Sequence, residues 1–243
     1  MENIIQDLSV DCVVFGFDFE RINVLLVDRE LHVPETGELI FSDRTLTGYH
    51  IYENEELDAA AYRILKELTG LENIYLEQFY TFGQLDRTSS ERDTKWRIHT
   101  QRISKRVVTV GYFALIDNTK VSLEFKGRRV QWVPIDEVGE LGFDHNFILA
   151  KALERLKDKV RKEPLAFELL PERFTLSQLQ KLYEVILETT FDKRNFRKKV
   201  AQMKYLIPLD EKQKGVSHKP GKLYLFSREV YEKTKRDRFD FTI

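Results

Sequence analysis

Hydrophobic positions change their spacing along the chain, and each change marks a predicted element. Residues 9–18 and 22–30 are β-branched and apolar, which predicts two strands joined by a short turn. Residues 55–69 repeat apolar side chains at helical spacing, and Gly70 follows as a helix stop. A loop is predicted at 31–47, and further strands are predicted at 74–84, 107–117 and 129–133. This first part of the chain therefore predicts a sheet with helices.

The spacing then becomes mainly helical. A helix is predicted over residues 146–162, with leucines recurring on one face. Pro164 ends it, because proline biases the preceding residue away from helical backbone. We place the domain boundary at this break, between residues 1–160 and 161–243.

The segment after the boundary has the order helix, helix, β-hairpin. Thr175 to Gln178 fits a capping box at the start of one helix. Asp192 can cap a second helix, in which Phe196 begins a buried stripe. Two strands are predicted at 205–209 and 222–226, around a polar loop. This order is typical of a winged helix-turn-helix.

Charge separates the same two parts of the chain. The 243 residues have a net charge of −1, which alone would argue against a nucleic-acid partner. Residues 1–150, however, carry 16 basic and 26 acidic side chains, and residues 151–243 carry 23 and 14. The halves therefore have net charges of −10 and +9, which indicates two domains with different partners.

The second helix of the basic part predicts a DNA-reading surface. Successive residues turn by about 100°, so the polar side chains gather opposite the stripe begun by Phe196. Arginine matches guanine edges, and asparagine and glutamine match adenine. Five basic residues between Lys193 and Lys199 favour this role over a merely solvated helix. The predicted DNA contacts are Lys193, Arg194, Asn195, Arg197, Lys198 and Gln202, with His218, Lys219 and Lys222 in the wing.

Other features narrow the class of protein. The single cysteine, Cys12, excludes an internal disulfide and is interpreted as a small buried hydrophobe. The N-terminus lacks the pattern of a signal peptide, and the apolar run from Val107 to Ile116 is too short to span a bilayer. We therefore expect a cytoplasmic protein without a membrane partner. Zinc-finger spacing, a glycine-rich phosphate loop and a Gly-x-Ser-x-Gly elbow are missing from the sequence.

Residues 48–71 resemble the Nudix box, G-x5-E-x7-R-E-U-x-E-E-x-G-U. The match keeps Glu55, Arg63, Leu65, Glu67, Gly70 and Leu71. The first departure is Tyr49, which occupies the position of the first glycine of the box. A glycine, Gly48, lies one residue before that position. Ile64 and Leu68 replace two of the glutamates.

These losses have a chemical meaning. Nudix hydrolases cleave a diphosphate with Mg²⁺ held by helix carboxylates, and Glu67 is the one left of three on that face. A lone carboxylate cannot neutralise the charge that develops in the reaction. We therefore predict a catalytically silent domain that is not an enzyme and holds no metal or cofactor. The alternative is residual hydrolysis with ligands from elsewhere, such as Glu77 or Glu91. In a silent domain, Arg63 and Glu55 can also be read as structural partners across the helix and its preceding loop.

The degenerate box and the C-terminal half together resemble a bacterial family, the Nudix-related transcriptional regulators. The segments that carry the resemblance are Phe143-Asp144-His145, Leu169 to Gln180, Asp192 to Lys198 and Gly221 to Phe226. The resemblance implies an α+β protein, with a Nudix-like α/β/α sandwich and mixed sheet followed by a winged helix-turn-helix. It also implies a homodimer that binds operator DNA and a small effector.

The effector is the finer question. The box resembles the sugar-responsive subset of the family, including its arabinose regulator, so a sugar such as L-arabinose is expected; ADP-ribose, with control of NAD metabolism, is the alternative. A sugar would need hydrogen bonds from polar side chains around a cleft. The candidates are Arg29, Tyr49, His50, Glu67, Asp86, Arg87 and His145, although His145 is also placed to cap the following helix.

One segment departs from the family pattern. Thr88–Arg106 is polar and basic with Trp96 inside it, where family members usually have a short loop. It is interpreted as a long excursion from the sheet. The alternatives are a dimerisation arm, a lid over the effector pocket, an extra DNA contact and a disordered insertion.

Overall fold

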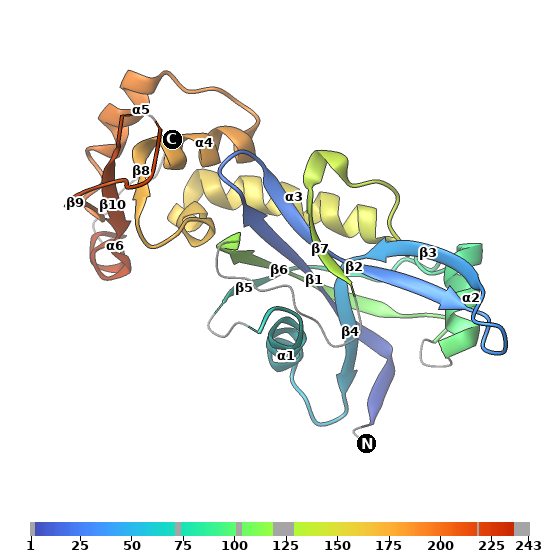
Figure 1. Ribbon diagram of the computed structural model, residues 1–243. Helices are drawn as coiled ribbons and strands as arrows, with labels where there is room; N and C mark the ends of the chain where they lie inside the picture. The colour runs from blue at the N-terminus through green and yellow to red at the C-terminus, as the bar shows by residue number, and fades with distance from the viewer. Residues whose placement is uncertain (1–2, 71–73, 101–103, 119–128, 218, 236–243) are drawn as a thin grey trace. The chain divides into compact units, whose positions relative to one another are not determined.

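The computed structural model describes residues 3–70, 74–100, 104–118, 129–217 and 219–235 (Figure 1). The chain divides into two compact units. Among the described residues, the first unit contains most of those up to Arg155, and the second contains those from Leu156 onward together with residues 17–22 and 117–118. Each unit is considered by itself below.

The first unit is built on a seven-stranded sheet with the order β3-β2-β1-β6-β5, while β4 pairs with β1 and β7 pairs with β2. The sheet is mixed, because β1 and β6 are parallel whereas β4, β3, β7 and β5 pair antiparallel to their neighbours. The strands are β1 (Ile4–Phe17), β2 (Ile22–His32), β3 (Leu39–Thr45), β4 (Thr47–Tyr52), β5 (Tyr75–Phe82), β6 (Val108–Ile116) and β7 (Val130–Pro134).

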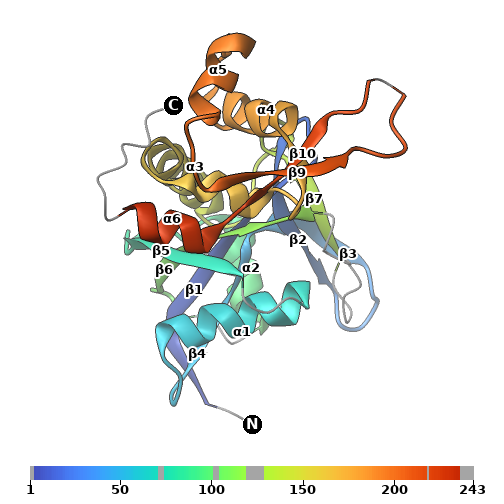
Figure 2. The same cartoon turned by 90° about the vertical axis from the view of Figure 1, so that its left-hand side faces the viewer.

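Helices cover both faces of this sheet. Figures 1 and 2 show α1 (Leu57–Thr69) on one face and the beginning of α3 (His145–Lys162) on the other. The sequence requires this, because successive strand residues point to opposite faces and β1 is fully buried from Val10 to Phe15 apart from Asp11. The predicted α+β class is confirmed.

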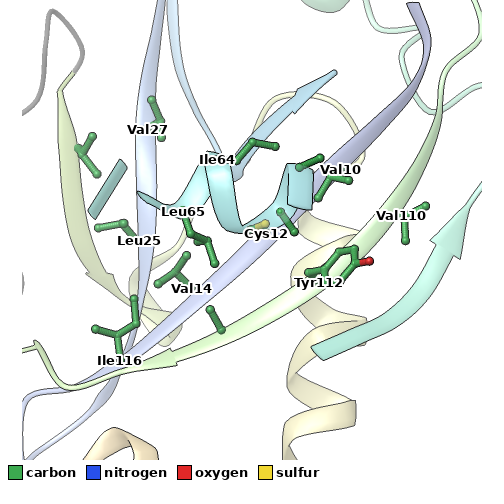
Figure 3. Close-up of a cluster of buried hydrophobic side chains, with 14 of the residues drawn as sticks. Val10, Cys12, Val14, Leu25, Val27, Ile64, Leu65, Val110, Tyr112 and Ile116 are labelled. Atoms are coloured by element: carbon green, nitrogen blue, oxygen red, sulfur yellow. The ribbon is translucent and has the colours of Figure 1, made fainter. Parts of the chain in front are cut away.

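The face under α1 holds a continuous apolar cluster. Ala60, Ala61, Ile64 and Leu65 of the helix pack against alternate residues of β1 and β6 (Figure 3). Cys12 lies in this cluster with no exposed surface, so its interpretation as a buried hydrophobe is confirmed. Burial there raises the pKa of its thiol, and the neighbouring charge of Asp11 adds to the effect.

The loop prediction for residues 31–47 is wrong. Residues 33–38 turn the chain, but β3 follows and pairs antiparallel with β2, and β4 begins directly after it. The strand β3 lies at one end of the main strand order, and its side chains are mostly exposed or half-buried. An edge strand of this kind has no apolar alternation for the sequence to display.

The excursion Thr88–Arg106 contains a helix, α2 (Glu91–Thr100). A disordered insertion is therefore wrong for residues 88–100; residues 101–103 lie outside the described part. Its low apolar content hid the helix, since the only buried side chain in it is Asp93.

The second unit has the predicted winged-helix order. The last residues of α3 lead into a 3-10 segment, Pro164–Leu169, which follows the predicted helix break. The elements after it are β8 (Phe174–Thr175), α4 (Leu176–Leu187), α5 (Lys193–Val200), β9 (Leu206–Lys212), β10 (Lys222–Phe226) and α6 (Arg228–Lys235). The last of these, α6, was not predicted from the sequence.

Local capping fixes the two helices of this unit. Thr175 and Gln178 form both bonds of the predicted capping box. The Asp192 carboxylate accepts a hydrogen bond from the Asn195 backbone N–H at 2.9 Å. Phe196, Val200 and Met203 are buried, as predicted, although α5 ends at Val200 and Met203 lies in the following turn.

The hairpin of the wing forms a small sheet in the order β8-β10-β9. Behind it the Phe167 and Phe226 rings stack with centroids 4.5 Å apart. Figure 2 shows the loop between β9 and β10 projecting beyond this sheet. The prediction of a winged helix-turn-helix is therefore confirmed at the level of its elements.

Candidate functional site

The first unit contains a cavity of about 550 Å³ beside β1, β2 and β4. A volume of this order is usual for small-molecule sites. Of the residues predicted to bind an effector, the lining includes Arg29, Tyr49, His50, Arg87 and His145. Glu67 and Asp86 are exposed and do not line it.

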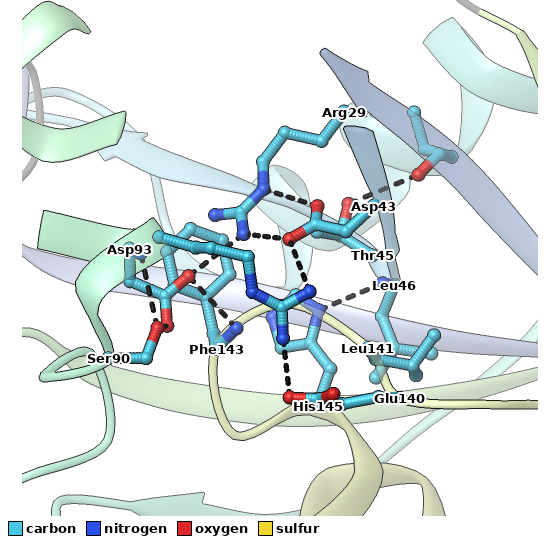
Figure 4. Close-up of polar contacts among 12 residues, drawn as sticks. Arg29, Asp43, Thr45, Leu46, Ser90, Asp93, Glu140, Leu141, Phe143 and His145 are labelled. Atoms are coloured by element: carbon cyan, nitrogen blue, oxygen red, sulfur yellow. Dashed lines mark hydrogen bonds and ion pairs between the residues drawn. The ribbon is translucent and has the colours of Figure 1, made fainter. Parts of the chain in front are cut away.

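Arg29 forms one buried polar cluster at the cavity (Figure 4). Its Nε donates to Asp43 Oδ1 at 2.7 Å, and its Nη2 donates to Asp93 Oδ1 at 2.9 Å and also binds Asp43. The Phe143 ring lies 4.3 Å from the guanidinium carbon. The remaining nitrogen, Nη1, is buried and has no hydrogen-bond partner among the described residues. Arg29, which lines the cavity, therefore has one unsatisfied donor within this buried cluster.

Arg87 forms a second buried cluster. It binds Asp144 with two nitrogens, at 2.8 and 3.1 Å, and Asp11 with one at 3.4 Å. Burial lowers the pKa of Arg87, but the hydrogen bond and charge of Asp144, with those of Asp11, outweigh it and raise the pKa overall. The guanidinium therefore stays charged and holds two carboxylates in place.

His145 is held as a neutral ring. Its Nδ1 accepts a hydrogen bond from the Leu46 backbone N–H at 2.8 Å, so the ring proton belongs on Nε2. Nε2 lies 3.6 Å from Asp11 Oδ1. Burial is the largest influence on the pKa of His145 and lowers it. The alternative role as a helix cap is wrong, because α3 begins at His145 and the ring contacts Leu46 and Asp11 instead.

Three consecutive residues join the two clusters to α3. Phe143 packs on Arg29 and donates its backbone N–H to Asp93 at 3.2 Å. Asp144 binds Arg87, and His145 is the first residue of the helix. Phe143 has a φ of 58°, a left-handed backbone that aromatic residues rarely adopt. Such strain at a cavity is typical of functional sites.

Gly48 brings a strand close to the cavity floor. A Cβ built at this position would lie 1.9 Å from Asp11 Oδ1, so only glycine fits here. The neighbouring His50 places its Nδ1 3.2 Å from the Leu8 carbonyl oxygen. A carbonyl only accepts, so Nδ1 carries a proton and donates to it.

Sequence reasoning missed several residues of this site. Asp11, Phe143 and Trp96 line the cavity but were not proposed as contacts. Asp11 had a usable signal, since it is a carboxylate within an otherwise apolar buried strand. Trp96 was noticed only as part of the excursion Thr88–Arg106, because its own position depends on how α2 lies beside β3.

Residues of the Nudix-box segment, which holds Mg²⁺ in a hydrolase, make internal contacts here. Glu55 binds Arg63 at 2.7 Å, and this hydrogen bond lowers the pKa of Glu55. Ile64 is buried in the apolar cluster, while the Leu68 side chain lies outside the described residues. Within the described part of the chain, no three His, Cys, Asp or Glu residues are grouped as a metal site would require.

The proposed substitute ligands are also engaged elsewhere. Glu77 binds Arg155 at 2.9 Å, and Glu91 pairs with Lys95 at 2.8 Å on the exposed side of α2. The structural role weighed for Glu55 and Arg63 is therefore the one that their contacts fit.

The second unit presents the predicted basic surface on α5. The predicted side chains on this helix are exposed, and so are Gln202, Lys219 and Lys222; His218 lies outside the described residues. Arg194, Arg197 and Lys198 form no ion pair within the described ranges. Their charges are therefore available to an anionic partner. By contrast, Arg173 pairs with Glu211 at 2.6 Å, which ties the wing strand β9 to the segment before α4.

Over the described ranges, no helix is both long and apolar enough to cross a membrane.

Comparison with known proteins finds a matching domain family for each part of the chain. Residues 6–156 match the NUDIX domain model, and residues 166–226 match the model of the NrtR DNA-binding winged helix domain. The chain is 30% identical to an ADPR responsive transcriptional repressor, NtrR, of Acinetobacter baylyi, over 93% of this chain and 84% of the relative.

Solved structures agree with these matches. NrtR of Shewanella oneidensis, crystallised with a 27mer DNA, has 30% identity and a TM-score of 0.73, covering 93% of this chain and 96% of that one. A MutT/nudix family protein of Enterococcus faecalis, at 23% identity and a TM-score of 0.65 over 92% of this chain and 88% of its own, shows the shared fold alone. The chain belongs to the NrtR family of Nudix-related transcriptional regulators.

Proposed function

We propose that this protein is an ADP-ribose-responsive regulator, in which the Nudix domain binds the effector and the winged helix binds an operator. The observation that carries the proposal is the cavity of the Nudix unit, beside which the buried clusters of Arg29 and Arg87 meet at Phe143 and Asp144, just before α3. A partly satisfied arginine beside a cavity suits an anionic ligand.

The choice of effector rests on the relatives. The A. baylyi protein is named for its response to ADPR, the abbreviation of ADP-ribose, and it resembles this chain over nearly its whole length. The expected sugar effector, L-arabinose, has no support from the comparisons. ADP-ribose contains two ribose units, so hydroxyl-binding groups such as Asp11 and His50 suit it equally well.

The DNA partner follows from α5. Its exposed arginines, asparagine and lysines are the residue types that contact base edges and phosphates. We keep the proposal of a homodimer, which would read two half-sites about one or more helical turns apart. The boundary between residues 160 and 161, with an effector domain before it and a DNA-binding domain after it, also stays a proposal.

The experiment begins by selecting an operator from random duplex DNA with the full-length protein. ADP-ribose is then titrated into a gel-shift assay with that duplex, and L-arabinose serves as the control ligand. We expect ADP-ribose to change operator affinity by about 5- to 150-fold, the usual range of coupling between sites. A response to L-arabinose with none to ADP-ribose contradicts the proposal. Failure to select any duplex would contradict the DNA-binding part of the proposal and favour instead a sensor that docks another protein through its basic domain.

The hydrolase alternative is tested separately. The protein is incubated with Mg²⁺ and ADP-ribose, and the mixture is separated by chromatography. We expect intact ADP-ribose, because the metal-binding face of α1 lacks the carboxylates that the reaction needs. Release of AMP in proportion to protein concentration would show instead that hydrolysis persists.

A further inference from the structure

The helix α2 forms part of the cavity wall. Its Trp96 and Thr100 line the cavity, and so does Thr88, which precedes it. The helix runs from Glu91 to Thr100, beside β3 (Figure 1). The excursion from the sheet, Thr88–Arg106, therefore contributes residues to the cavity wall. Of the interpretations given for this segment, a lid over the effector pocket fits this position best.

A buried contact fixes the helix at its beginning. The Asp93 side chain is 3% exposed and binds Arg29 at 2.9 Å, and it also accepts the Phe143 backbone N–H at 3.2 Å. The Ser90 hydroxyl accepts the Asp93 backbone N–H at 3.1 Å, which caps the first turn. Breaking a buried ion pair on one side is costly, so α2 is held in one place on the wall.

Trp96 lies one turn after this anchor. Its ring meets the Phe41 ring edge-to-face, with centroids 6.4 Å apart, and the Arg29 guanidinium carbon lies 5.4 Å from the ring centroid. The side chain is only half-buried and is not part of the cluster under α1. A large aromatic ring that is held by its neighbours and also borders a cavity offers a rigid stacking surface.

We infer that Trp96 stacks against the adenine ring of the bound effector and sets specificity for an adenine-bearing ligand. The inference rests on the proposed function. Adenine is planar and stacks well on indole, whereas ribose and diphosphate have no π-face. The polar groups of Asp11, His50 and His145 remain for the ribose hydroxyls, and the unsatisfied Nη1 donor of Arg29 for a phosphate oxygen.

The test uses the two tryptophans of the chain, Trp96 and Trp132. In the Trp132→Phe variant, Trp96 is the sole indole reporter, and calorimetry establishes saturation with ADP-ribose. We expect saturation to quench Trp96 emission, because a stacked purine contacts the indole. Emission that does not change at saturation overturns the inference alone. Absence of binding to the unchanged protein overturns both this inference and the proposed function.

A second arm measures affinity by calorimetry. Trp96→Ala should weaken ADP-ribose binding by roughly tenfold or more, and Trp96→Phe should restore most of the loss, since stacking needs a ring and not the indole N–H. Ile98→Ala is the matched control, because Ile98 is on the same helix and 68% exposed. Unchanged ADP-ribose affinity in Trp96→Ala contradicts the inference. If Trp96→Ala does not fold, the fluorescence measurement on Trp132→Phe decides whether Trp96 stacks on the effector.

Discussion

The neutral ring of His145 makes the stability of the Nudix unit depend on pH. Its Nδ1 accepts from the Leu46 N–H, so a proton added there would break that hydrogen bond. Burial already holds the pKa of His145 below its ordinary value of about 6.5. Folding therefore favours the neutral form, and the unfolded chain binds the proton more readily.

The expected result has a definite sign. Above about pH 6.5 both states are neutral at this residue, and the contribution of His145 to stability is fully present. As the pH falls below that value the unfolded state gains the proton first, so the free energy of unfolding decreases. His145→Gln should remove this part of the decrease. Urea unfolding at pH 7.5 and 5.5 measures it, with His99→Gln, an exposed histidine, as the control. Equal pH dependence in wild type and His145→Gln would refute the argument.

The sequence predicted the contact of a side chain when its partner lies nearby in the chain. It failed when the partner lies far away in the chain. The Glu55–Arg63 pair lies within the box and could be weighed from the sequence as a structural contact. The Arg29–Asp93 pair joins residues 64 positions apart, and no local pattern indicates it. Among the other box residues that the match keeps, Glu67 is exposed and Gly70 ends the helix α1.

At the scale of elements, α5 presents Arg194, Arg197 and Lys198 to solvent, and these three form no ion pair within the described residues. Removing Arg194, Arg197 and Lys198 together by alanine substitution should lower operator affinity by about a hundredfold or more, since each base contact contributes about 1 to 3 kcal/mol. The salt dependence of the residual binding should also become shallower. Gel shifts with the selected operator, at two salt concentrations, measure both effects.

The matched control removes three cations from the first unit, the exposed Lys66 and Lys95 and the half-buried Lys151. Because it changes the net charge equally, it separates a specific surface from general attraction to DNA. The fold is checked by circular dichroism in both variants. If operator affinity is unchanged by the α5 substitutions, or falls equally in the control, α5 is not the DNA-binding surface.

Whether an element could be predicted depended on where its stabilising contacts lie. The capped helices α4 and α5 carry their signals in consecutive residues, namely Thr175 with Gln178 and Asp192 before the basic run. The strand β3 is mainly exposed, and α2 buries only a carboxylate, so neither has an apolar period. The strand β3 is stabilised by pairing with β2, and α2 by the contact of Asp93 with Arg29 of β2. A single sequence does not display such distant contacts.

At the scale of the whole molecule, α3 belongs to both units. Its first residue, His145, is part of the cavity, and residues from Leu156 onward belong to the DNA-binding unit. We propose that effector binding acts through this helix on the relative orientation of the two winged helices of a dimer. A ligand can shift such an equilibrium only if it binds one arrangement better than the other.

Linkage gives this proposal a quantitative test. If ADP-ribose changes operator affinity by some factor, operator must change ADP-ribose affinity by the same factor. Calorimetric titration of ADP-ribose into free protein and into the operator complex measures it, with a scrambled duplex of equal length as the control. Equal affinity for ADP-ribose in the free and operator-bound states would rule out the relay through α3.

The left-handed backbone of Phe143 affects how far the cavity is preorganised for a ligand. Such a conformation costs about 1 to 3 kcal/mol, which glycine would avoid, but glycine would leave Arg29 without its ring. The cost falls on every folded molecule, whether or not it holds a ligand. The empty protein is therefore less stable than its packing alone would allow. Because Phe143 and Arg29 are already ordered in the empty protein, their ordering adds no entropy cost when a ligand binds.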